Sequence, residues 1–184
     1  MEYFDTFDVD GTWIGQAPRA EVHARGYWHR SAHVFLFDGD GRMLLQRRAA
    51  DKDLYPGRWD YAVGEHLRSG ESYRRGAARG LCEELGLFGL SLQPLGALFA
   101  EPLTWPGGVD CEFQQAFVTR HDGPVTADGV EVVALRWTDR EALRVEAAES
   151  PHNFTPWFLR ELGRLRVIEN WPAVWRLAQS NALS

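Results

Sequence analysis

The 184-residue sequence contains few cysteines, no excess of positive charge and no long apolar run. Its two cysteines, Cys82 and Cys111, form no closely spaced pair, which argues against a disulfide framework or a zinc site. Lysine and arginine number 20 against 26 aspartates and glutamates, and the resulting net charge of −6 argues against a nucleic-acid-binding surface. Since no apolar stretch reaches transmembrane length, we also expect no membrane partner.

The first residues, MEYFDTFDVDG, are acidic and lack the basic-then-apolar order of a signal peptide. We therefore expect a cytoplasmic protein whose thiols stay reduced. The length suits one domain with a sizeable core, and no internal repeat divides it. Residues 1–184 are predicted to form a single domain.

The stretch at residues 64–87, GEHLRSGESYRRGAARGLCEELGL, is the part around which the chain is organised. It opens with a glycine-rich turn, continues as a proline-free run compatible with a helix, and ends at Gly86. Glycine is the usual residue just past a helix end, because it adopts the left-handed conformation at little cost. Glu83 and Glu84 therefore fall in the last turn of the predicted helix.

Two adjacent carboxylates near a helix C-terminus are electrostatically disfavoured, because the helix dipole attracts cations there. A bound divalent cation would offset the repulsion, and Mg²⁺ is typically held by a few carboxylates together with substrate phosphates. The alternative is a solvated acidic helix end in which Glu83 pairs with Arg79 on the same helix face. The two glutamates alone leave both interpretations open.

The spacing within this stretch resembles the signature of Nudix hydrolases, G-x5-E-x7-R-E-U-x-E-E-x-G-U, in which U is aliphatic. The matching positions are Glu71, Arg79, Leu81, Glu83, Glu84, Gly86 and Leu87. Glu65 stands in place of the opening glycine, and Gly80 stands in place of the glutamate that follows the arginine. In the family that glutamate helps to bind metal or acts as the base, so Gly80 leaves one carboxylate missing.

Similarity to the isopentenyl-diphosphate isomerase branch of the same superfamily extends over roughly residues 25–160. It rests on His29, Arg30, residues 34–37, residues 45–49, Lys52, residues 56–57, Trp59, Asp110, Glu112 and residues 154–157. The resemblance implies an α/β (α+β) Nudix fold, in which a mixed β-sheet is sandwiched between helices and a loop-helix-loop segment carries the metal.

The same resemblance implies an enzyme that uses Mg²⁺ or Mn²⁺ to cleave a small-molecule diphosphate, nucleotide-like or otherwise. Glu83 and Glu84 match the family's metal ligands and catalytic carboxylates, and the Gly64 carbonyl is a candidate for a further oxygen ligand. Glu71 and Arg79 match the ion pair that orients loop and helix in the family. These two residues are therefore assigned to structural support.

Because Gly80 lacks a carboxylate, a hydrolase would need its general base or one metal ligand from elsewhere. Glu112 is the first candidate for these roles, and Glu131 is its rival. Asp110 and Glu112 are two residues apart, so on a strand their side chains would point to the same face. An exposed glutamate at a strand end is the simpler alternative for Glu112.

Arg48 and Lys52 match isomerase residues that contact the diphosphate, and arginine presents a fork of donors suited to phosphate oxygens. A solvated loop in which they alternate with Asp51 and Asp53 would explain the same pattern. Trp105 is a candidate for stacking on a base or packing against a prenyl chain, although tryptophan also serves as an interior or interface anchor.

Histidines supply a further set of candidate ligands. His66 matches one of the metal histidines of the isomerase branch, and His29 is a candidate for another. His23 lies one residue out of register with the N-terminal ligand of that branch. Because a neutral imidazole ligates metals, these histidines could hold an ion; hydrogen-bonded histidines at a sheet edge are the alternative.

Isomerase activity itself is disfavoured, because the isomerase needs a catalytic cysteine at the position of Gly64. Neither Cys82 nor Cys111 matches that place. Two functions remain open. The retained glutamate pair favours a diphosphate hydrolase, whereas the two departures from the signature favour a degenerate Nudix domain that binds a diphosphate ligand with little or no hydrolysis.

The remaining pattern predicts further elements along the chain. A β-hairpin is expected at residues 3–9 and 13–15, within an N-terminal extension at residues 1–28, followed by a short helix at residues 18–26. Strands are expected at residues 32–37, 43–46, 59–63, 111–118 and 131–137, and helices at residues 139–147, 155–165 and 172–178. Residues 102–108 are predicted to form a loop and residues 168–184 a helical tail.

The eight tryptophans permit an apolar subunit interface, and thus a homodimer.

Overall fold

The structure is a computed structural model that describes residues 2–52, 54–105 and 108–180. A seven-stranded mixed sheet has the order β5-β4-β3-β8-β7, with β6 paired to β3 and β9 paired to β4. Its strands are β3 (His29–Phe37), β4 (Met43–Arg48), β5 (Trp59–Asp60), β6 (Val63–His66), β7 (Gln93–Trp105), β8 (Gly108–Arg120) and β9 (Val132–Thr138). The central pair, β3 and β8, is parallel, and the other pairs are antiparallel.

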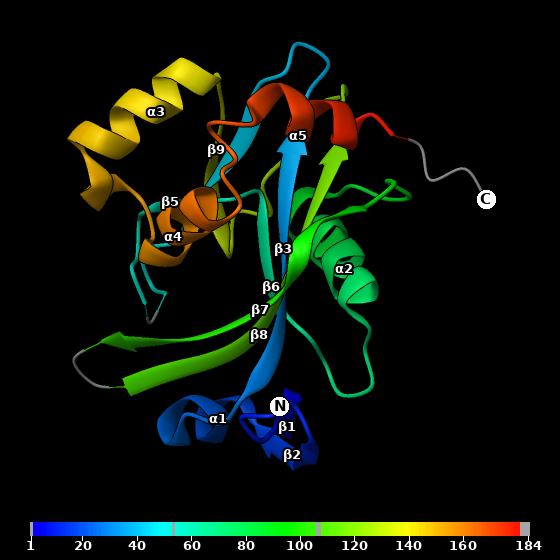
Figure 1. Ribbon diagram of the computed structural model, residues 1–184, viewed down its shortest axis with the longest axis vertical. Coiled ribbons are helices and arrows are strands. Elements are labelled where there is room, and N and C mark those ends of the chain that lie inside the picture. The colour runs from blue at the N-terminus through cyan, green and yellow to red at the C-terminus, as the bar shows by residue number, and fades with distance from the viewer. Residues whose placement is uncertain (1, 53, 106–107, 181–184) are drawn as a thin grey trace.

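Helices cover both faces of this sheet, as the α/β prediction requires (Figure 1). They are α2 (Tyr73–Leu85), α3 (Arg140–Glu149), α4 (Pro156–Arg164) and α5 (Trp171–Ala178), with a 3₁₀ turn at Pro151–Asn153. Strand β3 alternates between the two faces, because successive side chains of a strand point to opposite sides. Val34 and Leu36 pack in the apolar cluster under α2, whereas Phe35 and Phe37 pack in the cluster under α3, α4 and α5. The predicted sandwich is confirmed.

The helix of the signature ends at Gly86, as its sequence predicts, and begins after Ser72. The Ser72 hydroxyl accepts a hydrogen bond from the amide of Arg75 at the N-terminal end. Gly86 adopts a left-handed conformation with φ of 67° at the C-terminal end. The amides of Gly86 and Leu87 donate to the carbonyls of Cys82 and Leu81, respectively, which satisfies the last turn of the helix.

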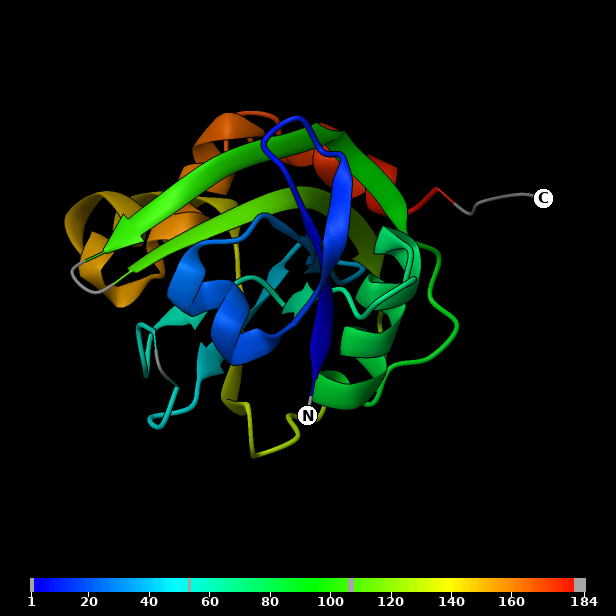
Figure 2. The same cartoon turned by 90° about the horizontal axis from the view of Figure 1, so that it is seen from below.

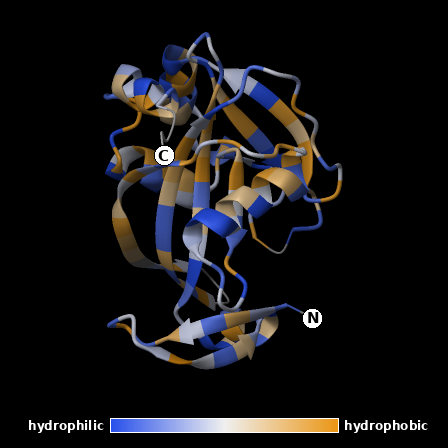
Figure 3. Ribbon diagram, turned by 90° about the vertical axis from the view of Figure 1, so that its right-hand side faces the viewer, coloured by the Kyte–Doolittle hydropathy of each residue, from blue (hydrophilic) through white to orange (hydrophobic). Residues whose placement is uncertain are grey.

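Residues 2–25 form a small unit at the lower end of the sheet. This unit faces the viewer in Figure 2 and stands apart from the main sheet in Figure 3. It consists of the hairpin β1 (Tyr3–Phe7) and β2 (Trp13–Pro18), followed by α1 (Arg19–Arg25). Asp5 joins the unit to the signature loop, because its carboxylate accepts hydrogen bonds from the Ser69 hydroxyl at 2.8 Å and the Gly70 amide at 2.9 Å. An ion pair of 3.1 Å links Asp5 to Arg30 on β3.

Two predictions about elements are wrong. The strand expected at residues 59–63 is two strands, since the chain leaves β4 after Asp60 and pairs with β3 from Val63 onward. Of the loop expected at residues 102–108, residues 102–105 are the end of β7 and residue 108 begins β8, while residues 106–107 lie outside the described part. Pro102 lies on an edge strand, where proline is tolerated.

The C-terminal segment is part of the main core rather than an added tail. Trp171, Val174 and Ala178 of α5 are buried in the cluster that includes Phe37. The indole of Trp171 donates to the Gly41 carbonyl at 2.8 Å. Residues 181–184 lie outside the described part of the chain. Within the described residues, no helix combines the length and apolar character needed to cross a bilayer.

Candidate active site

A cleft of about 680 Å³ opens between the N-terminal unit, the signature loop, β8 and α4. Its acidic and imidazole lining consists of Glu2, His23, His33, Asp51, Asp60, Glu65, His66, Glu83, Glu84, Asp110, Glu112, Glu131 and Glu161. Its basic lining includes Arg48, Lys52, Arg160 and Arg164, and apolar surface comes from Leu54, Phe99, Leu103 and Trp157. The size is that of a site for a small organic ligand.

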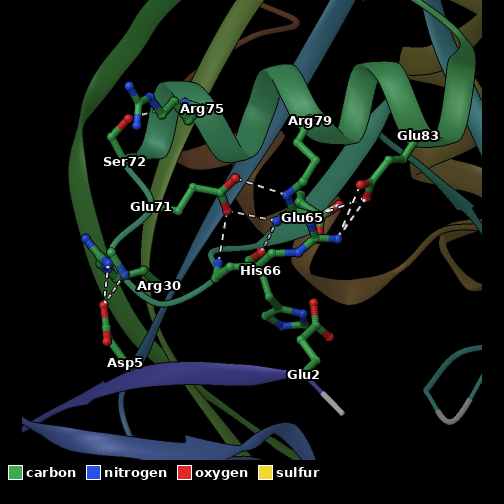
Figure 4. A network of polar contacts seen from close by, with 12 residues as sticks. Glu2, Asp5, Arg30, Glu65, His66, Glu71, Ser72, Arg75, Arg79 and Glu83 are labelled. Atoms are coloured by element: carbon green, nitrogen blue, oxygen red, sulfur yellow. Dashed lines mark hydrogen bonds and ion pairs between the residues drawn. The ribbon is translucent and has the colours of Figure 1, made fainter.

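Arg79 is the centre of a network that we call the signature cluster, formed with Glu65, Glu71 and Glu83 (Figure 4). The guanidinium donates to both Glu71 oxygens at 2.9 and 3.0 Å. It also lies 3.0 Å from Glu65 and 3.2 Å from Glu83, and it donates to the His66 carbonyl at 2.8 Å. One side chain on α2 thereby holds both the signature loop and strand β6.

The charges of Glu71 and Arg79 stabilise each other. Burial favours neutral Glu71, but the hydrogen bonds from Arg79 and from the Arg68 amide outweigh it, so the pKa of Glu71 is lowered. Burial likewise opposes the charge on Arg79, and the carboxylates of Glu71 and Glu65 raise its pKa nonetheless. Such pairing is consistent with a supporting role for Glu71 and Arg79.

The two candidate glutamates at the end of α2 lie in different environments. Glu83 has a side chain that is 47% exposed, and it pairs with Arg68 and Arg79. Glu84 is buried, and among the described residues none forms an ion pair or hydrogen bond with its carboxylate. Burial, followed by the charge of Glu65, raises the pKa of Glu84 well above its usual range. A buried carboxylate in this state suits a cation as its partner.

The position of the isomerase cysteine is closed to a larger side chain. A Cβ atom on Gly64 would lie 2.6 Å from the Tyr61 ring, which stacks on His33. Cys82 is on α2 and Cys111 is buried on β8; neither is among the residues that line the cleft. No thiol therefore takes the place of the missing one within the described cleft.

A second group of polar side chains, the histidine cluster, consists of His23, His29, His66, Asp110 and Glu112. One possible ligand atom from each of the three histidines and from Asp110 lies within 4.8 Å of the others. Nε2 of His29 is 3.4 Å from Asp110 and 3.6 Å from Glu112, and Nε2 of His66 is 3.0 Å from Glu112. Asp110 and Glu112, two residues apart on β8, thus both reach His29.

His23 joins this cluster although its register in the sequence argued against it. Its Nε2 atom lies 3.9 Å from Asp110. Helix α1 ends at Gly26, whose φ of 64° is left-handed, and a Cβ atom there would lie 2.4 Å from Val109. This close approach of the helix end to β8 brings His23 inward, so Gly26 is the sequence signal that could have indicated it.

The protonation states of the histidines follow from their partners. Nδ1 of His29 donates to the Tyr27 carbonyl at 3.0 Å, because a carbonyl only accepts, and its Nε2 lone pair then faces the cluster. Burial lowers the pKa of His29, which keeps the ring neutral. Nδ1 of His66 accepts from Arg19 at 2.7 Å, so its Nε2 donates to Glu112. Burial lowers the pKa of His66 to about 3.

The two carboxylates of the cluster differ in charge. Burial and the neighbouring Glu112 raise the pKa of Asp110 to about 8. Contacts from the histidines outweigh burial and hold the pKa of Glu112 well below its usual range. Nε2 of His29 and Oδ1 of Asp110 are buried without a hydrogen bond to any described residue. Buried imidazole and carboxylate groups in this state fit a divalent metal ion.

Arg48 and Lys52, the candidate phosphate contacts, also line the cleft. Arg48 donates to the Leu54 carbonyl and lies 3.9 Å from Asp60, which accepts a hydrogen bond of 2.7 Å from the Trp157 indole. Lys52 pairs with Glu131, whose side chain is 58% exposed and lies just before β9. The Trp105 side chain lies outside the described residues.

His33, on β3, is buried and lines the cleft. Nδ1 of His33 is 2.7 Å from Glu161 of α4, which also accepts from Arg164 at 3.0 Å. Burial opposes protonation of His33, yet the charge of Glu161 raises its pKa. Nothing in the spacing of residues 128 positions apart could have paired His33 with Glu161.

Comparisons with known proteins agree with this architecture. A family model for the NUDIX domain matches residues 27–158. An isopentenyl-diphosphate Delta-isomerase from Serratia proteamaculans is 36% identical over 177 residues, covering 94% of this chain and 96% of that protein. An uncharacterized Nudix hydrolase, orf19, from Rhodococcus erythropolis is 32% identical over 161 residues, covering 84% and 86%. The structure of DR0079 from Deinococcus radiodurans has a TM-score of 0.73 at 22% identity, covering 89% of this chain and 99% of that one, and supports the fold.

Proposed function

Since this chain belongs to the Nudix family, we propose that it hydrolyses a diphosphate linkage in a small organic molecule with the help of Mg²⁺ or Mn²⁺. The observation that carries the proposal is one cleft whose lining combines acids with few partners and basic side chains. Glu84 is buried and Asp110 has a buried oxygen without a hydrogen bond, and Arg48 and Lys52 line the same cleft. Cations bound to the acids, together with the basic side chains, would hold a diphosphate.

The two sets of acidic groups suit different ions. The histidine cluster offers imidazole nitrogens, which favour a transition ion such as Mn²⁺ over Mg²⁺. The Glu84 side offers oxygen only, which suits Mg²⁺ as well as Mn²⁺. When bound, such ions neutralise phosphate charge and make a water molecule more acidic. Glu84 and Glu112 would hold the ions, and Arg48 would orient the phosphates.

Isomerisation of a prenyl diphosphate is the reaction named for most of the similar curated proteins, and Gly64 argues against it here. The branch needs a cysteine at this position, and the Tyr61 ring leaves no space for a thiol. A domain that binds a diphosphate without hydrolysing it is the second candidate, which Gly80 favours. Catalysis and binding are separated by the experiment below.

The test measures phosphate release with Mg²⁺ or Mn²⁺ over a panel of diphosphates. The panel contains nucleoside di- and triphosphates, ADP-ribose, nucleotide sugars, dinucleotide coenzymes, coenzyme A and prenyl diphosphates, with a coupling phosphatase where the product requires it. Turnover of one class that disappears in Glu84→Gln and persists in Glu141→Gln, an exposed carboxylate on α3, is expected. Loss of one general catalytic group should lower the rate about 10²–10⁴-fold.

Three other outcomes would change the proposal. Binding of one ligand class, seen as a raised melting temperature without turnover, would establish the binding domain instead. Conversion of isopentenyl diphosphate to its isomer without phosphate release would show that the chain replaces the missing thiol with another group. Hydrolysis that is equal in the wild type and in Glu84→Gln would reject the assigned site.

A further inference from the structure

Gly80 has no room for the glutamate that the signature places there. A Cβ atom on Gly80 would lie 2.4 Å from Cγ1 of Val63 on β6, a distance that forces a shift. The same atom would lie 3.2 Å from Cβ of Glu65 and 3.4 Å from Oε2 of the same residue. The direction in which a side chain at position 80 would leave α2 is therefore already occupied by the side chain of Glu65.

Glu65 is the other position at which the sequence departs from the signature, where glycine is usual. Its side chain is 16% exposed and lines the cleft. Arg79 anchors it through Oε2 at 3.0 Å. The two departures are thus neighbours in space: a carboxylate is lost from the helix and one is gained from the strand that packs against it.

Glu84 lies four residues after Gly80, so it shares the face of α2 that meets Glu65. Like Glu65 it lines the cleft; it is only 6% exposed, and no described residue donates a hydrogen bond to its carboxylate. Glu65 has one cation in contact, Arg79, which it shares with Glu71 and Glu83. Two neighbouring carboxylates in one cleft offer oxygen ligands to a divalent cation.

We propose that Glu65 supplies from β6 the metal-binding carboxylate that the signature assigns to residue 80, and that Glu65 and Glu84 together hold a divalent cation on the helix side of the cleft. This inference rests on the proposed function, which assigns the bound cation its part in hydrolysis. Relative to the signature, this exchange of positions keeps the number of carboxylates the same but moves one of them from the helix to β6. The glycine at position 80 then reflects the exchange and does not imply a lost function.

Glu65 could instead serve only as a partner of Arg79, and a matched pair of variants separates the two roles. Glu65→Gln and Glu71→Gln each remove one negative charge from contact with the same guanidinium. Mn²⁺ binding is measured by electron paramagnetic resonance and by isothermal titration, and the melting temperature in the presence of a chelator reports folding. Glu65→Gln should lose at least about tenfold in Mn²⁺ affinity at one class of site, since even outer partners of ligands are worth about 10–100-fold.

Glu71→Gln should retain that affinity within about twofold and lose melting temperature instead. Equal losses of Mn²⁺ affinity in both variants would show that Glu65 acts only through Arg79 and would overturn the proposal. Unchanged Mn²⁺ binding in Glu65→Gln would overturn it as well.

A reversal variant tests the exchange itself. Glu65→Gly combined with Gly80→Glu recreates the order of the signature, and Val63→Ala removes the Cγ1 atom that a Cβ on residue 80 would meet. The triple variant should recover Mn²⁺ affinity to within a few-fold of the wild type, whereas Glu65→Gly with Val63→Ala should not. A folded triple variant that binds Mn²⁺ no better than this double variant would reject the exchange.

These readouts remain interpretable if the proposed function fails. Should the wild type hydrolyse no diphosphate, the loss of Mn²⁺ binding in Glu65→Gln still supports Glu65 as a ligand. Should the wild type hydrolyse one class, Glu65→Gln is expected to turn it over about 10²-fold more slowly. Hydrolysis by Glu65→Gln at the wild-type rate would leave the proposed hydrolase function standing and would show that Glu65 is not part of its site.

Discussion

The signature cluster and the histidine cluster lie in one cleft, but they balance their charges in opposite ways. In the signature cluster the guanidinium of Arg79 contacts Glu65, Glu71 and Glu83. In the histidine cluster Asp110 and Glu112 face imidazoles, Glu112 also accepts a hydrogen bond from Gln114, and burial keeps His29 and His66 neutral. The acids of the first cluster thus have a guanidinium in contact, whereas among the described residues no arginine or lysine forms an ion pair with the acids of the second.

From this difference we infer that the residues of a family signature need not be the ones that depend most on a bound metal ion. The residues with the densest pairing hold the loop and helix in place. Those with unsatisfied atoms, such as Nε2 of His29 and Oδ1 of Asp110, lie outside the signature stretch. Variants of the two clusters should therefore separate stability from metal affinity.

Arg79→Met should have the largest effect, and it should act on stability. It leaves Glu65 and Glu71 buried without their cation, and breaking a buried ion pair costs about 3–5 kcal/mol. The free energy of unfolding from urea titration measures this loss. Arg144→Met, which breaks an exposed pair on α3, is the control and should change stability little. An equal, small change in both variants would contradict the central role of Arg79.

His29→Gln should have the next largest effect, and it should act on metal binding. The variant removes the buried Nε2 lone pair that faces Asp110, and we expect Mn²⁺ affinity to fall about 100-fold or more. Titration with Mn²⁺ gives the affinity, and melting in a chelator shows whether the fold is kept. His152→Gln, on the exposed 3₁₀ turn, serves as the control. Should His29→Gln bind Mn²⁺ normally, the histidine cluster is not a metal site.

Asp60 allows a further test of how burial and pairing affect an acid, because it is a buried acid whose nearest guanidinium, on Arg48, is 3.9 Å away. Burial raises the pKa of Asp60 to about 6. The folded state thus keeps a proton that the unfolded state has already lost, so Asp60 favours folding below about pH 4 and loses this contribution as the pH rises to about 6.

Relative to Asp60→Asn, the wild type should therefore lose roughly 2–3 kcal/mol of stability between pH 4 and pH 7. Denaturant titrations at several pH values give this difference. The exposed Asp122→Asn, where pairing with Arg120 lowers the pKa of the aspartate, should show no trend of that sign. A wild type that gains stability over Asp60→Asn with rising pH would contradict the assignment.

Asp5→Ala should have the smallest effect of the four, about 1–2 kcal/mol, because it leaves the Gly70 amide without its acceptor. It should also weaken Mn²⁺ binding several-fold, since the N-terminal unit that carries His23 is held less firmly. Urea and Mn²⁺ titrations measure the two changes, and Asp10→Ala in the exposed hairpin turn is the control. A loss of stability with unchanged Mn²⁺ affinity would show that docking of the unit does not influence the cluster.

Local patterns were sufficient for the end of the signature helix and for most strands. Gly86 acts within a few residues of chain, so the C-terminal end of that helix could be predicted from sequence. The sheet covered by helices on both faces and the placement of Glu71 beside Arg79 came from the family resemblance.

The site was less predictable, because its details depend on contacts between distant elements. The turn between β5 and β6 is set by a change of strand partner, which no local signal shows. His23 enters through the close packing of Gly26 against Val109. Glu65 reaches the space beside Gly80 only because β6 packs against α2, and a residue-by-residue match to the signature treats the two positions as independent.

The stacking of Phe4 on His29 and His66, with ring centroids 5.5 and 5.1 Å apart, makes the N-terminal unit the cover of the histidine cluster. A ligand that binds only the covered state stabilises the cover by mass action. Protection of the α1 segment from a protease should therefore rise with Mn²⁺ concentration. Cleavage near Arg25 would then serve as a gauge of occupancy that needs neither substrate nor turnover.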